Sequence, residues 1–185
     1  MWVVIDLEAL LASAPYHPFF CEENVWHLLR APKLVAKERY AVFVTNPAHQ
    51  VALYQQRLAP AGEPVVWDYH VIAIARDSAR RGHERVWDRD SRLPFPCPVD
   101  RYFEETFPTL PLGAESLAPQ FRFVPFAEFE ERFASDRRHM RRVDGSWLQA
   151  PPPWPVIGAG HTLDRFLEFS DPIGGTVLGL DALGL

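Results

Sequence analysis

The stretch over residues 65–75 constrains the fold of this chain most, because β-branched and aromatic side chains dominate it. Such side chains favour a pleated, half-buried strand. A charged loop is predicted over residues 76–82, and residues 84–88 then have the pattern of a second strand. Because the chain contains 18 prolines among 185 residues, we expect many loops and few long helices around these strands.

Pairing the two predicted strands in a hairpin centred on Ala79 brings a histidine and an aspartate together. In that register His70 lies directly opposite Asp88, and opposed residues have Cβ atoms roughly 4.5–5.5 Å apart. This separation suits an imidazole–carboxylate hydrogen bond, provided that no bulge shifts the register. The side chain of Asp90 would point to the same face of the strand as Asp88, but it would lie opposite Asp68. Asp90 is therefore the second candidate for the acid that pairs with His70. Taken singly, His70 is more simply a core histidine, and Asp88 a turn or capping residue.

A predicted helix begins at Cys21 and ends before Pro32. Three residues at helical spacing give it an apolar face: Val25, Leu28 and Leu29. Glu22 and Glu23 lie in the first turn, where carboxylates suit the positive end of the helix dipole. The same dipole favours the thiolate of Cys21 over the thiol, which makes this residue a candidate nucleophile. The alternative is a cysteine that serves only as a small buried apolar residue.

Cys21, His70 and Asp88 have the chemical types of a catalytic triad for acyl transfer. The imidazole would take the proton of the thiol and hand it to the leaving group, while the carboxylate would fix the imidazole tautomer. A metal site built from the same three residues is the alternative. Their spacing matches no strong zinc pattern, so the triad is the preferred hypothesis.

The composition argues against several classes of protein. A length of 185 residues fits one domain, and a net charge of -5 argues against broad nucleic-acid binding. Two cysteines do not form the disulfide framework of a secreted domain, which favours the reducing cytoplasm. No apolar run reaches transmembrane length, and residues 1–14 contain acids without a basic start, unlike a signal peptide. We therefore expect a cytoplasmic protein that binds neither nucleic acid nor membranes.

Further strands and helices are predicted from the rest of the pattern. Residues 40–44 form a short strand, and a turn at residues 45–47 is expected to return the chain to residues 51–54 as its hairpin partner. Helices are predicted over residues 99–107 and 127–133, a strand over 121–126, a short helix after Thr162 and a closing strand after residue 173. The pattern does not decide between strand and helix for residues 1–13.

Short strings that cover about residues 16 to 175 carry a resemblance to a known family. In chain order they are Cys21-Glu22-Glu23-Asn24 followed by Trp26, Tyr40-Ala41-Val42-Phe43, Trp67-Asp68-Tyr69-His70-Val71, Leu93-Pro94-Phe95-Pro96-Cys97, Phe133-Ala134-Ser135-Asp136-Arg137, His139-Met140 and Pro151-Pro152-Pro153. Their order and spacing resemble those of the protein N-terminal glutamine amidohydrolases, and strings of this length are more specific than a lone motif. Residues 1–16 and the tail after Pro172 depart from the family pattern.

This resemblance implies an α+β fold of the papain or transglutaminase type, in which a helix bearing the cysteine packs on an antiparallel sheet bearing the histidine and aspartate. Carried over residue by residue, it implies a triad of Cys21, His70 and Asp88 in a single domain over residues 1–185. The implied activity is hydrolysis of the side-chain amide of N-terminal glutamine to N-terminal glutamate and ammonia, without metal or cofactor. In eukaryotes this step feeds an N-degron pathway. The expected partners are proteins or peptides with N-terminal glutamine, and we expect a monomer.

Recognition of an N-terminal residue requires a negative group that meets its protonated α-amine, because an unpaired buried charge is costly. Glu22, Glu23 and Asp68 are the acids nearest the expected triad in sequence, and Trp67 and Tyr69 are candidates for the pocket wall. The alternatives are that the two glutamates only complement the helix dipole and that the aromatic residues belong to the core.

Two other functions remain open from the sequence. A Cys-His-Asp protease or a transglutaminase-like acyltransferase would use the same three residues, and a non-catalytic N-terminal peptide-binding module would keep only the fold. Peptide cleavage, conversion of internal glutamine or amine incorporation would indicate the first. Ligand binding that survives Cys21→Ala, without ammonia release by the wild type, would indicate the second.

Overall fold

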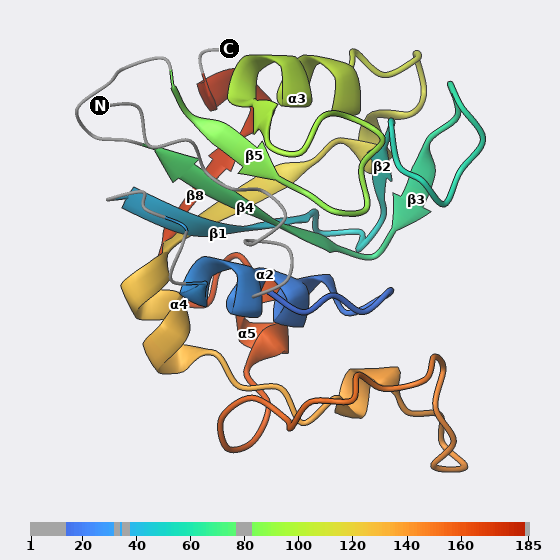
Figure 1. Cartoon of the computed structure of the whole chain (residues 1–185). Coiled ribbons are helices and arrows are strands. Elements are labelled where there is room, and N and C mark those ends of the chain that lie inside the picture. Colours follow the sequence, from blue (N-terminus) through green and yellow to red (C-terminus); the bar gives the residue numbers. More distant parts are fainter. Residues whose placement is uncertain (1–13, 32–33, 35–37, 77–82, 184–185) are drawn as a thin grey trace.

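The computed structural model describes residues 14–31, 34, 38–76 and 83–183, which form an α+β fold around an antiparallel sheet (Figure 1). This sheet has the strand order β6–β5–β4–β1–β7–β8, and each neighbouring pair is antiparallel. In chain order the strands are β1 (Glu38–Thr45), β4 (His70–Arg76), β5 (Arg85–Trp87), β6 (Cys97–Pro98), β7 (Gln120–Pro125) and β8 (Thr176–Gly179). A separate two-stranded sheet consists of β2 (Val51–Leu53) and β3 (Val65–Trp67).

Helices cover both faces of the larger sheet (Figure 1). One face carries α2 (Cys21–Arg30), α4 (Phe126–Arg132) and α5 (Leu163–Leu167), and the opposite face carries α3 (Val99–Thr106). The remaining described elements are the 3-10 helices η1 (Glu115–Leu117), η2 (Arg138–Met140) and η3 (Leu180–Leu183). Among the described parts of the chain, no helix combines the length and the apolar character needed to cross a bilayer.

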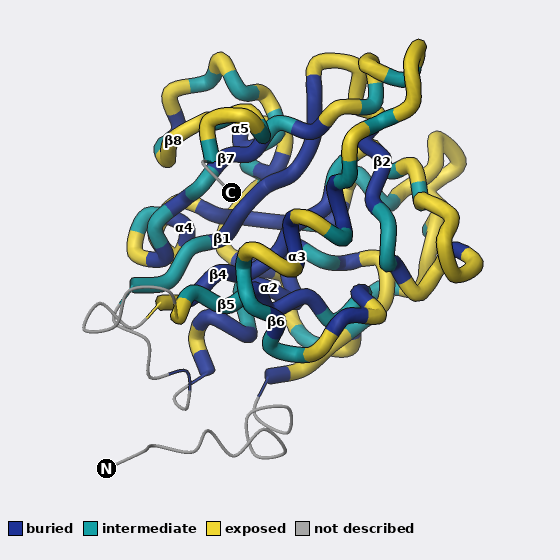
Figure 2. The backbone as a smooth tube through the Cα atoms, turned by 90° about the horizontal axis from the view of Figure 1, so that it is seen from above, coloured by how far each residue is buried: buried dark blue, intermediate teal, exposed yellow. Residues whose placement is uncertain are grey.

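Two apolar cores follow from the alternation of side chains along the central strands. In β1, Ala41 and Phe43 belong to the core beneath α2, whereas Val42 and Val44 belong to the core beneath α3. Because helices cover both faces, the middle of the sheet is buried on both sides (Figure 2). The central strands therefore read as continuous apolar runs in the sequence rather than as alternating ones.

The apolar run over residues 65–75 forms two strands rather than one. β3 ends at Trp67 and β4 begins at His70, so the two residues between them leave the ladder. The Thr45 hydroxyl donates to the carbonyl oxygen of Asp68 at 2.6 Å, and the Tyr69 N–H donates to the Asp68 carboxylate at 3.0 Å. These side-chain hydrogen bonds take the place of strand hydrogen bonds at residues 68 and 69. The apolar run is therefore divided into β3 in the smaller sheet and β4 in the larger one.

The predicted hairpin between residues 40–44 and 51–54 is wrong. β1 pairs with β4 and β7 in the larger sheet, whereas β2 pairs with β3. The Asn46 side chain holds the connection, because its oxygen accepts hydrogen bonds from the N–H groups of Ala48 and Gln50. Its amide nitrogen donates to the carbonyl oxygens of Gln50, Ser116 and Ala118, which turns the chain away from β1.

The register predicted between β4 and β5 is also wrong, by two residues. Ile74 lies opposite Val86 and Ala73 lies opposite Trp87, and β5 ends there, before the position opposite His70. A shift of two residues keeps every side chain on its predicted face, whereas a shift of one would have reversed them. For this reason Asp88, just beyond the end of β5, still reaches His70.

Most other predicted elements are confirmed with small differences at their ends: α2, α3, α4, α5, β1, β5, β7 and β8. Thr162 precedes α5 but makes no side-chain cap. Its hydroxyl instead donates to the carbonyl oxygen of Arg132 and accepts from the N–H of Ala134. The alternatives for residues 1–13 and the loop predicted over residues 77–82 lie outside the described residues.

Candidate active site

Cys21 is the first residue of α2, and several local interactions fix where that helix begins. Phe19 has φ of 67°, in the left-handed region, and turns the chain into the helix. The Asn24 side chain reaches back to the preceding segment, donating to the carbonyl oxygen of His17 and accepting from its N–H, both at 2.8 Å. Phe20 is fully buried. The cysteine is therefore held at the helix start, where the residue is half-buried.

His70, the first residue of β4, and Asp88, just after the end of β5, form a buried pair. The His70 Nε2 lies 3.2 Å from Asp88 Oδ1, and both side chains are 2% exposed. The contact is an ion pair when the imidazole is protonated, and its alignment falls short of a hydrogen bond. The Trp67 ring lies against the imidazole, with centroids 4.7 Å apart. Cys21 begins α2, His70 begins β4, and α2 packs on β4, so both side chains line one pocket.

Three further groups hold the Asp88 carboxylate in place. The Tyr102 hydroxyl of α3 donates to Oδ2 at 2.7 Å, and the Asp90 N–H donates to Oδ1 at 2.9 Å. The Gln56 side chain donates to Oδ2 at 3.4 Å. Sequence reasoning missed Tyr102 and Gln56, because their partners are distant in the chain and no local pattern identifies them.

Burial and charge shift the pKa values of this pair in opposite directions. Burial disfavours the imidazolium of His70, but the charge of Asp88 and its contact with the ring outweigh burial and raise the pKa of His70. Burial likewise opposes ionisation of Asp88, yet His70 and the donors around the carboxylate lower the pKa of Asp88. Both shifts favour the charged form of the pair in the folded protein.

The expectation of a thiolate at Cys21 is not met. Burial raises the pKa of Cys21 well above its ordinary value, and the charges of Glu22 and Asp90 add to the effect. The thiol donates to Glu22 Oε2 at 3.7 Å. The helix dipole therefore does not suffice to ionise this cysteine, and the thiol requires a base to remove its proton.

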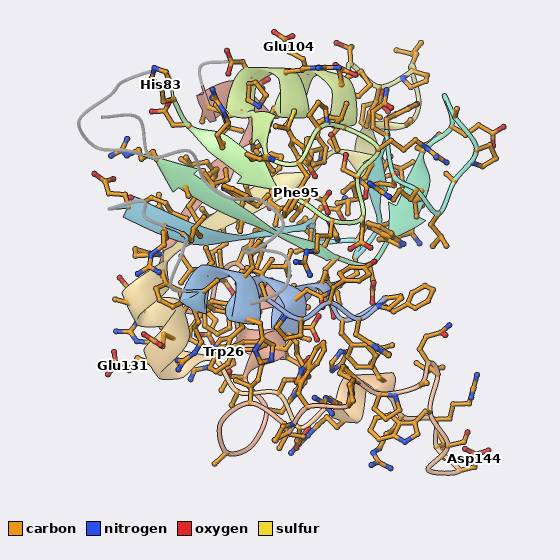
Figure 3. The ribbon with its side chains drawn as sticks, viewed as in Figure 1. Trp26, His83, Phe95, Glu104, Glu131 and Asp144 are labelled. Carbon is orange, nitrogen blue, oxygen red and sulfur yellow. The ribbon has the colours of Figure 1, made fainter. Side chains whose placement is uncertain are left out.

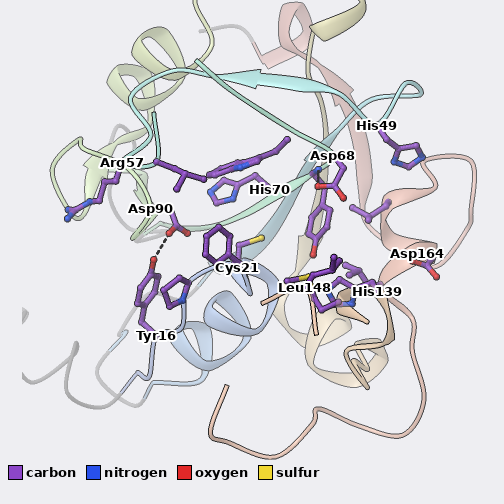
Figure 4. Close-up of a pocket in the computed structure, with 18 residues that line it drawn as sticks. Tyr16, Cys21, His49, Arg57, Asp68, His70, Asp90, His139, Leu148 and Asp164 are labelled. Carbon is purple, nitrogen blue, oxygen red and sulfur yellow. Dashed lines mark hydrogen bonds between the residues drawn. The ribbon is translucent and has the colours of Figure 1, made fainter. Parts of the chain in front are cut away.

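A pocket of about 510 Å³ opens over Cys21 and His70 (Figure 4). Figure 4 shows the two in the middle of its lining, between Tyr16 and Asp90 on one side and Asp68 and His139 on the other. Of the predicted site residues, five line the pocket: Cys21, His70, Trp67, Asp68 and Tyr69. Asp88 lies behind His70, and Glu22 and Glu23 are fully buried beside the pocket rather than in its lining.

Glu22 is a buried carboxylate with one oxygen that makes no hydrogen bond. Its Oε2 accepts from the Tyr69 hydroxyl at 3.1 Å, as well as from the Cys21 thiol. Its Oε1 has no hydrogen-bond partner and lies 3.5 Å from Nε2 of His139, a residue of the pocket lining. The Glu22 charge therefore acts on the pocket from just behind Tyr69 and His139.

Glu23, in contrast, is fully engaged in holding the fold. Arg137 donates to both of its carboxylate oxygens at 2.8 Å, and the Trp154 indole N–H donates to Oε2 at 2.7 Å. The same guanidinium donates to the carbonyl oxygens of three residues: Pro152, Trp154 and Pro155. This buried Glu23–Arg137 clamp ties the proline-rich segment to the start of α2, and the structure brings Glu23 to the clamp rather than to the pocket.

One group of three potential metal ligands occurs among the described residues: His70, Asp88 and Asp90, with ligand atoms within 4.8 Å of one another. Cys21 does not belong to it, unlike in the metal site considered from the sequence. Tyr16 donates to the Asp90 carboxylate, and Asp88 has the three donors described above, so hydrogen bonds already use these oxygens. Tyr16 and Asp90 are further pocket residues that the sequence did not identify as binding residues.

A cysteine beside a buried histidine–aspartate pair, at the base of a pocket, is the arrangement of enzymes that use a cysteine nucleophile. The family model described as N-terminal glutamine amidase matches residues 16–183. The chain belongs to this family of amidohydrolases.

Curated relatives agree with this family. The chain is 35% identical over 170 residues to protein N-terminal glutamine amidohydrolase of Bos taurus, covering 86% of this chain and 79% of the relative. It is 39% identical over 165 residues to the Arabidopsis thaliana protein of the same name, covering 83% and 74%. For the Homo sapiens protein the values are 34% over 170 residues, covering 86% and 80%.

Proposed function

We propose that this chain hydrolyses the side-chain amide of an N-terminal glutamine, giving N-terminal glutamate and ammonia. The observation that carries the proposal is the position of Cys21 next to the buried His70–Asp88 pair at the base of an open pocket, in a chain of this family. The substrates are proteins or peptides that begin with glutamine. We also propose that the protein acts as a cytoplasmic monomer without metal, cofactor or nucleic acid.

In the first step, His70 takes the proton of the Cys21 thiol as the sulfur attacks the δ-carbonyl carbon of glutamine. Because Nε2 faces Asp88, Nδ1 is the ring nitrogen left to accept this proton. The carbonyl oxygen becomes an oxyanion, and the backbone N–H of Cys21 is positioned to donate to it, since the first N–H groups of a helix have no partner within the helix. Asp88 stabilises the imidazolium that forms.

In the second step, the tetrahedral intermediate collapses and the C–N bond breaks. His70 returns its proton to the departing nitrogen, which leaves as ammonia, and a thioester joins the glutamine side chain to Cys21. A water molecule then attacks the thioester carbonyl while His70 accepts its proton. The C–S bond breaks, the thiol regains that proton, and the product leaves with a γ-carboxylate in place of the amide.

We propose that Asp68 and Glu22 provide the negative field that recognises the substrate α-ammonium. Asp68 lines the pocket, and the Oε1 of Glu22 has capacity for a further hydrogen bond. Trp67 and Tyr69 form part of the wall. Glu23 is not part of this field, because Arg137 neutralises its charge.

The fold supports the proposal at a coarser level. A helix that begins with the cysteine packs on an antiparallel sheet whose β4 begins with the histidine. We infer a papain- or transglutaminase-like relationship from this arrangement. Because such folds serve several acyl-transfer reactions, the substrate has to be settled by experiment.

The deciding experiment measures ammonia release from a peptide that begins with glutamine. We expect release by the wild type, loss of activity to background for Cys21→Ala, and retention by Cys97→Ala, which removes the other free cysteine. The same peptide with an acetylated N-terminus or with its glutamine inside the chain should release none, because neither presents the α-ammonium beside the amide.

Other products would indicate the rival functions. Cleavage of the peptide bond, or incorporation of an added primary amine into the glutamine side chain, would favour a protease or an acyltransferase. Peptide binding without any ammonia release by the wild type would favour a binding module. Either result would contradict the proposed hydrolysis.

A further inference from the structure

We propose that Asp90 recognises the side-chain amide nitrogen of the N-terminal glutamine and holds it while the C–N bond breaks. This inference rests on the proposed function and deepens it, because it names the group that distinguishes the substrate amide from the product carboxylate. Asp90 follows β5 and lines the pocket, whereas the proposed mechanism uses only Asp88 of the two aspartates in this segment.

Asp90 lies beside the group that must protonate the leaving nitrogen. One of its carboxylate oxygens and a ring nitrogen of His70 lie within 4.8 Å of each other. Two hydrogen bonds of about 2.9 Å that meet at one tetrahedral nitrogen span roughly 4.7 Å. The imidazole and the Asp90 carboxylate are therefore close enough for one substrate nitrogen to contact both.

Neighbouring residues fix the position of Asp90 before any substrate binds. The Tyr16 hydroxyl donates to Oδ1 of its carboxylate. The Asp90 N–H donates to Asp88 at 2.9 Å, and its carbonyl oxygen accepts from the Arg57 N–H at 2.8 Å. Because a carboxylate can accept hydrogen bonds at both oxygens, Asp90 keeps the capacity to accept one from a substrate N–H.

Opposing effects act on the charge of Asp90. Burial and the nearby Asp88 charge raise the pKa of Asp90, whereas His70, the Tyr16 hydroxyl and Arg57 act to lower it. Burial raises the pKa of Tyr16, so its hydroxyl keeps the proton that it donates. The Asp90 carboxylate is thus an acceptor in a partly desolvated place, where a hydrogen bond from an amide is stronger than in water.

The pocket has an acid on each side of Cys21, and glutamine has hydrogen-bond donors at both of its ends. Figure 4 shows Asp90 with Tyr16 on one side and Asp68 on the other. In the proposed function, Asp68 and Glu22 attract the α-ammonium. With the δ-carbonyl carbon at Cys21, the amide nitrogen at the far end of the side chain is directed to the opposite side, where Asp90 accepts one of its N–H groups.

The same contact separates the substrate from the product. An amide nitrogen offers two N–H donors, whereas an ionised γ-carboxylate offers only acceptors. The product would therefore place a negative charge against Asp90, and like charges brought together weaken binding. We expect Asp90 to favour binding of the amide and to promote release of the glutamate product.

The test compares two peptides that differ only in the group that leaves. One begins with glutamine, and the other begins with glutamate γ-methyl ester, which keeps the α-ammonium and the reacting carbonyl but has no side-chain N–H. Formation of the glutamate product gives kcat/KM, which covers binding and the step that breaks the C–N or C–O bond. We expect Asp90→Asn to lower kcat/KM roughly 10–100-fold for the amide and less than about threefold for the ester.

Asp68→Asn is the matched comparison, because it removes a pocket carboxylate from the α-ammonium side. Both peptides carry that ammonium, so this variant should lower both values of kcat/KM by a similar factor and keep their ratio. Inhibition by the product peptide, which begins with glutamate, is the second measurement. Asp90→Asn should lower its Ki by about tenfold, because a like charge is removed, whereas a distorted pocket would raise Ki.

The outcomes separate this inference from the proposed function. An equal loss on amide and ester in Asp90→Asn, a ratio that Asp68→Asn changes as much, or a Ki that does not fall would overturn the role of Asp90 alone. An acid limb of kcat/KM displaced as far as by removal of the Asp88 charge would also overturn it, because Asp90 would then act through His70.

No glutamate product from the glutamine peptide with the wild type would overturn the proposed function and this inference together. If Asp90→Asn does not fold, as judged by thermal unfolding, Asp90→Ser removes the same charge and provides the same comparison of amide, ester and product.

Discussion

Single residues around Cys21 show why sequence position alone does not determine its protonation. At the start of α2 the helix dipole favours a thiolate, yet burial and the neighbouring Glu22 and Asp90 carboxylates raise the pKa of Cys21. Burial of the sulfur is the largest of these effects, and the two carboxylates add to it. His70, whose pKa is raised by Asp88, is therefore the group on which activation of the thiol depends.

The pH dependence of the reaction should show the influence of Asp88 on His70. His70 accepts a proton only when neutral, so kcat/KM should fall on the acid side as pH drops through its raised pKa, which lies above the ordinary value of about 6.5. Asp88→Asn removes the charge that raises this pKa. We expect a loss of roughly 10³–10⁴-fold in kcat, with the acid limb moved to lower pH, as measured by kcat/KM from pH 4 to 9.

A control at a distant acid separates this effect from a general change in net charge. Asp100→Asn removes one exposed carboxylate from the first turn of α3 and should leave both the rate and the acid limb unchanged. An acid limb that stays in place in Asp88→Asn would show that His70 does not depend on this carboxylate.

At the scale of elements, the sequence predicted the individual helices and strands better than it predicted which strands pair with each other. α2 was identified by its apolar spacing, and the residues of β1 and β4 by their composition, because these are local properties. The partner of β1 was not predictable, since the Asn46 turn that redirects the chain depends on carbonyl oxygens some 70 residues away. The His70–Asp88 pair was reached in spite of a wrong register, because an even shift preserves the face of each side chain.

The Glu23–Arg137 clamp joins two elements that no local pattern connects. Glu23→Gln would leave the buried guanidinium without its counter-charge, although the hydrogen bonds could partly persist. We expect the free energy of unfolding, measured by urea denaturation, to fall by about 3–5 kcal/mol, as is typical when a buried ion pair loses a partner.

An exposed ion pair provides the control for this change. Glu105→Gln breaks the pair with Arg101 on the surface of α3, and its effect should stay below about 1 kcal/mol. Equal effects of the two substitutions would contradict a special role for the clamp.

At the scale of the whole molecule, the pocket combines segments that lie between residues 16 and 167. The larger sheet and its helices form a continuous body, and the arm over residues 138–150 extends away from it, with Asp144 at the outer end (Figure 3). Pocket residues such as Leu148 and Leu163 could not be predicted from the sequence, because their role depends on how the arm returns to the body.

Hydrogen exchange should distinguish the two parts of the molecule. The backbone of β1 is paired on both sides and its central residues are fully buried, whereas residues 141–146 of the arm are exposed. We expect β1 amides to exchange only through global unfolding, and amides at the arm tip to exchange orders of magnitude faster. Comparable protection of both segments, measured by native-state exchange and mass spectrometry, would contradict this.

The first turn of α2 has a consequence for how the chain can vary in length. Its three consecutive side chains contact different neighbours. Cys21 lines the pocket, Glu22 accepts a hydrogen bond from the Tyr69 hydroxyl, and Glu23 forms an ion pair with Arg137. Successive residues of a helix are rotated by about 100°, so deleting one residue here would turn each remaining side chain toward the wrong neighbour. The spacing of this turn is therefore fixed, whereas the outer end of the arm, where residues 141–146 are exposed and lie outside the pocket lining, can lengthen or shorten.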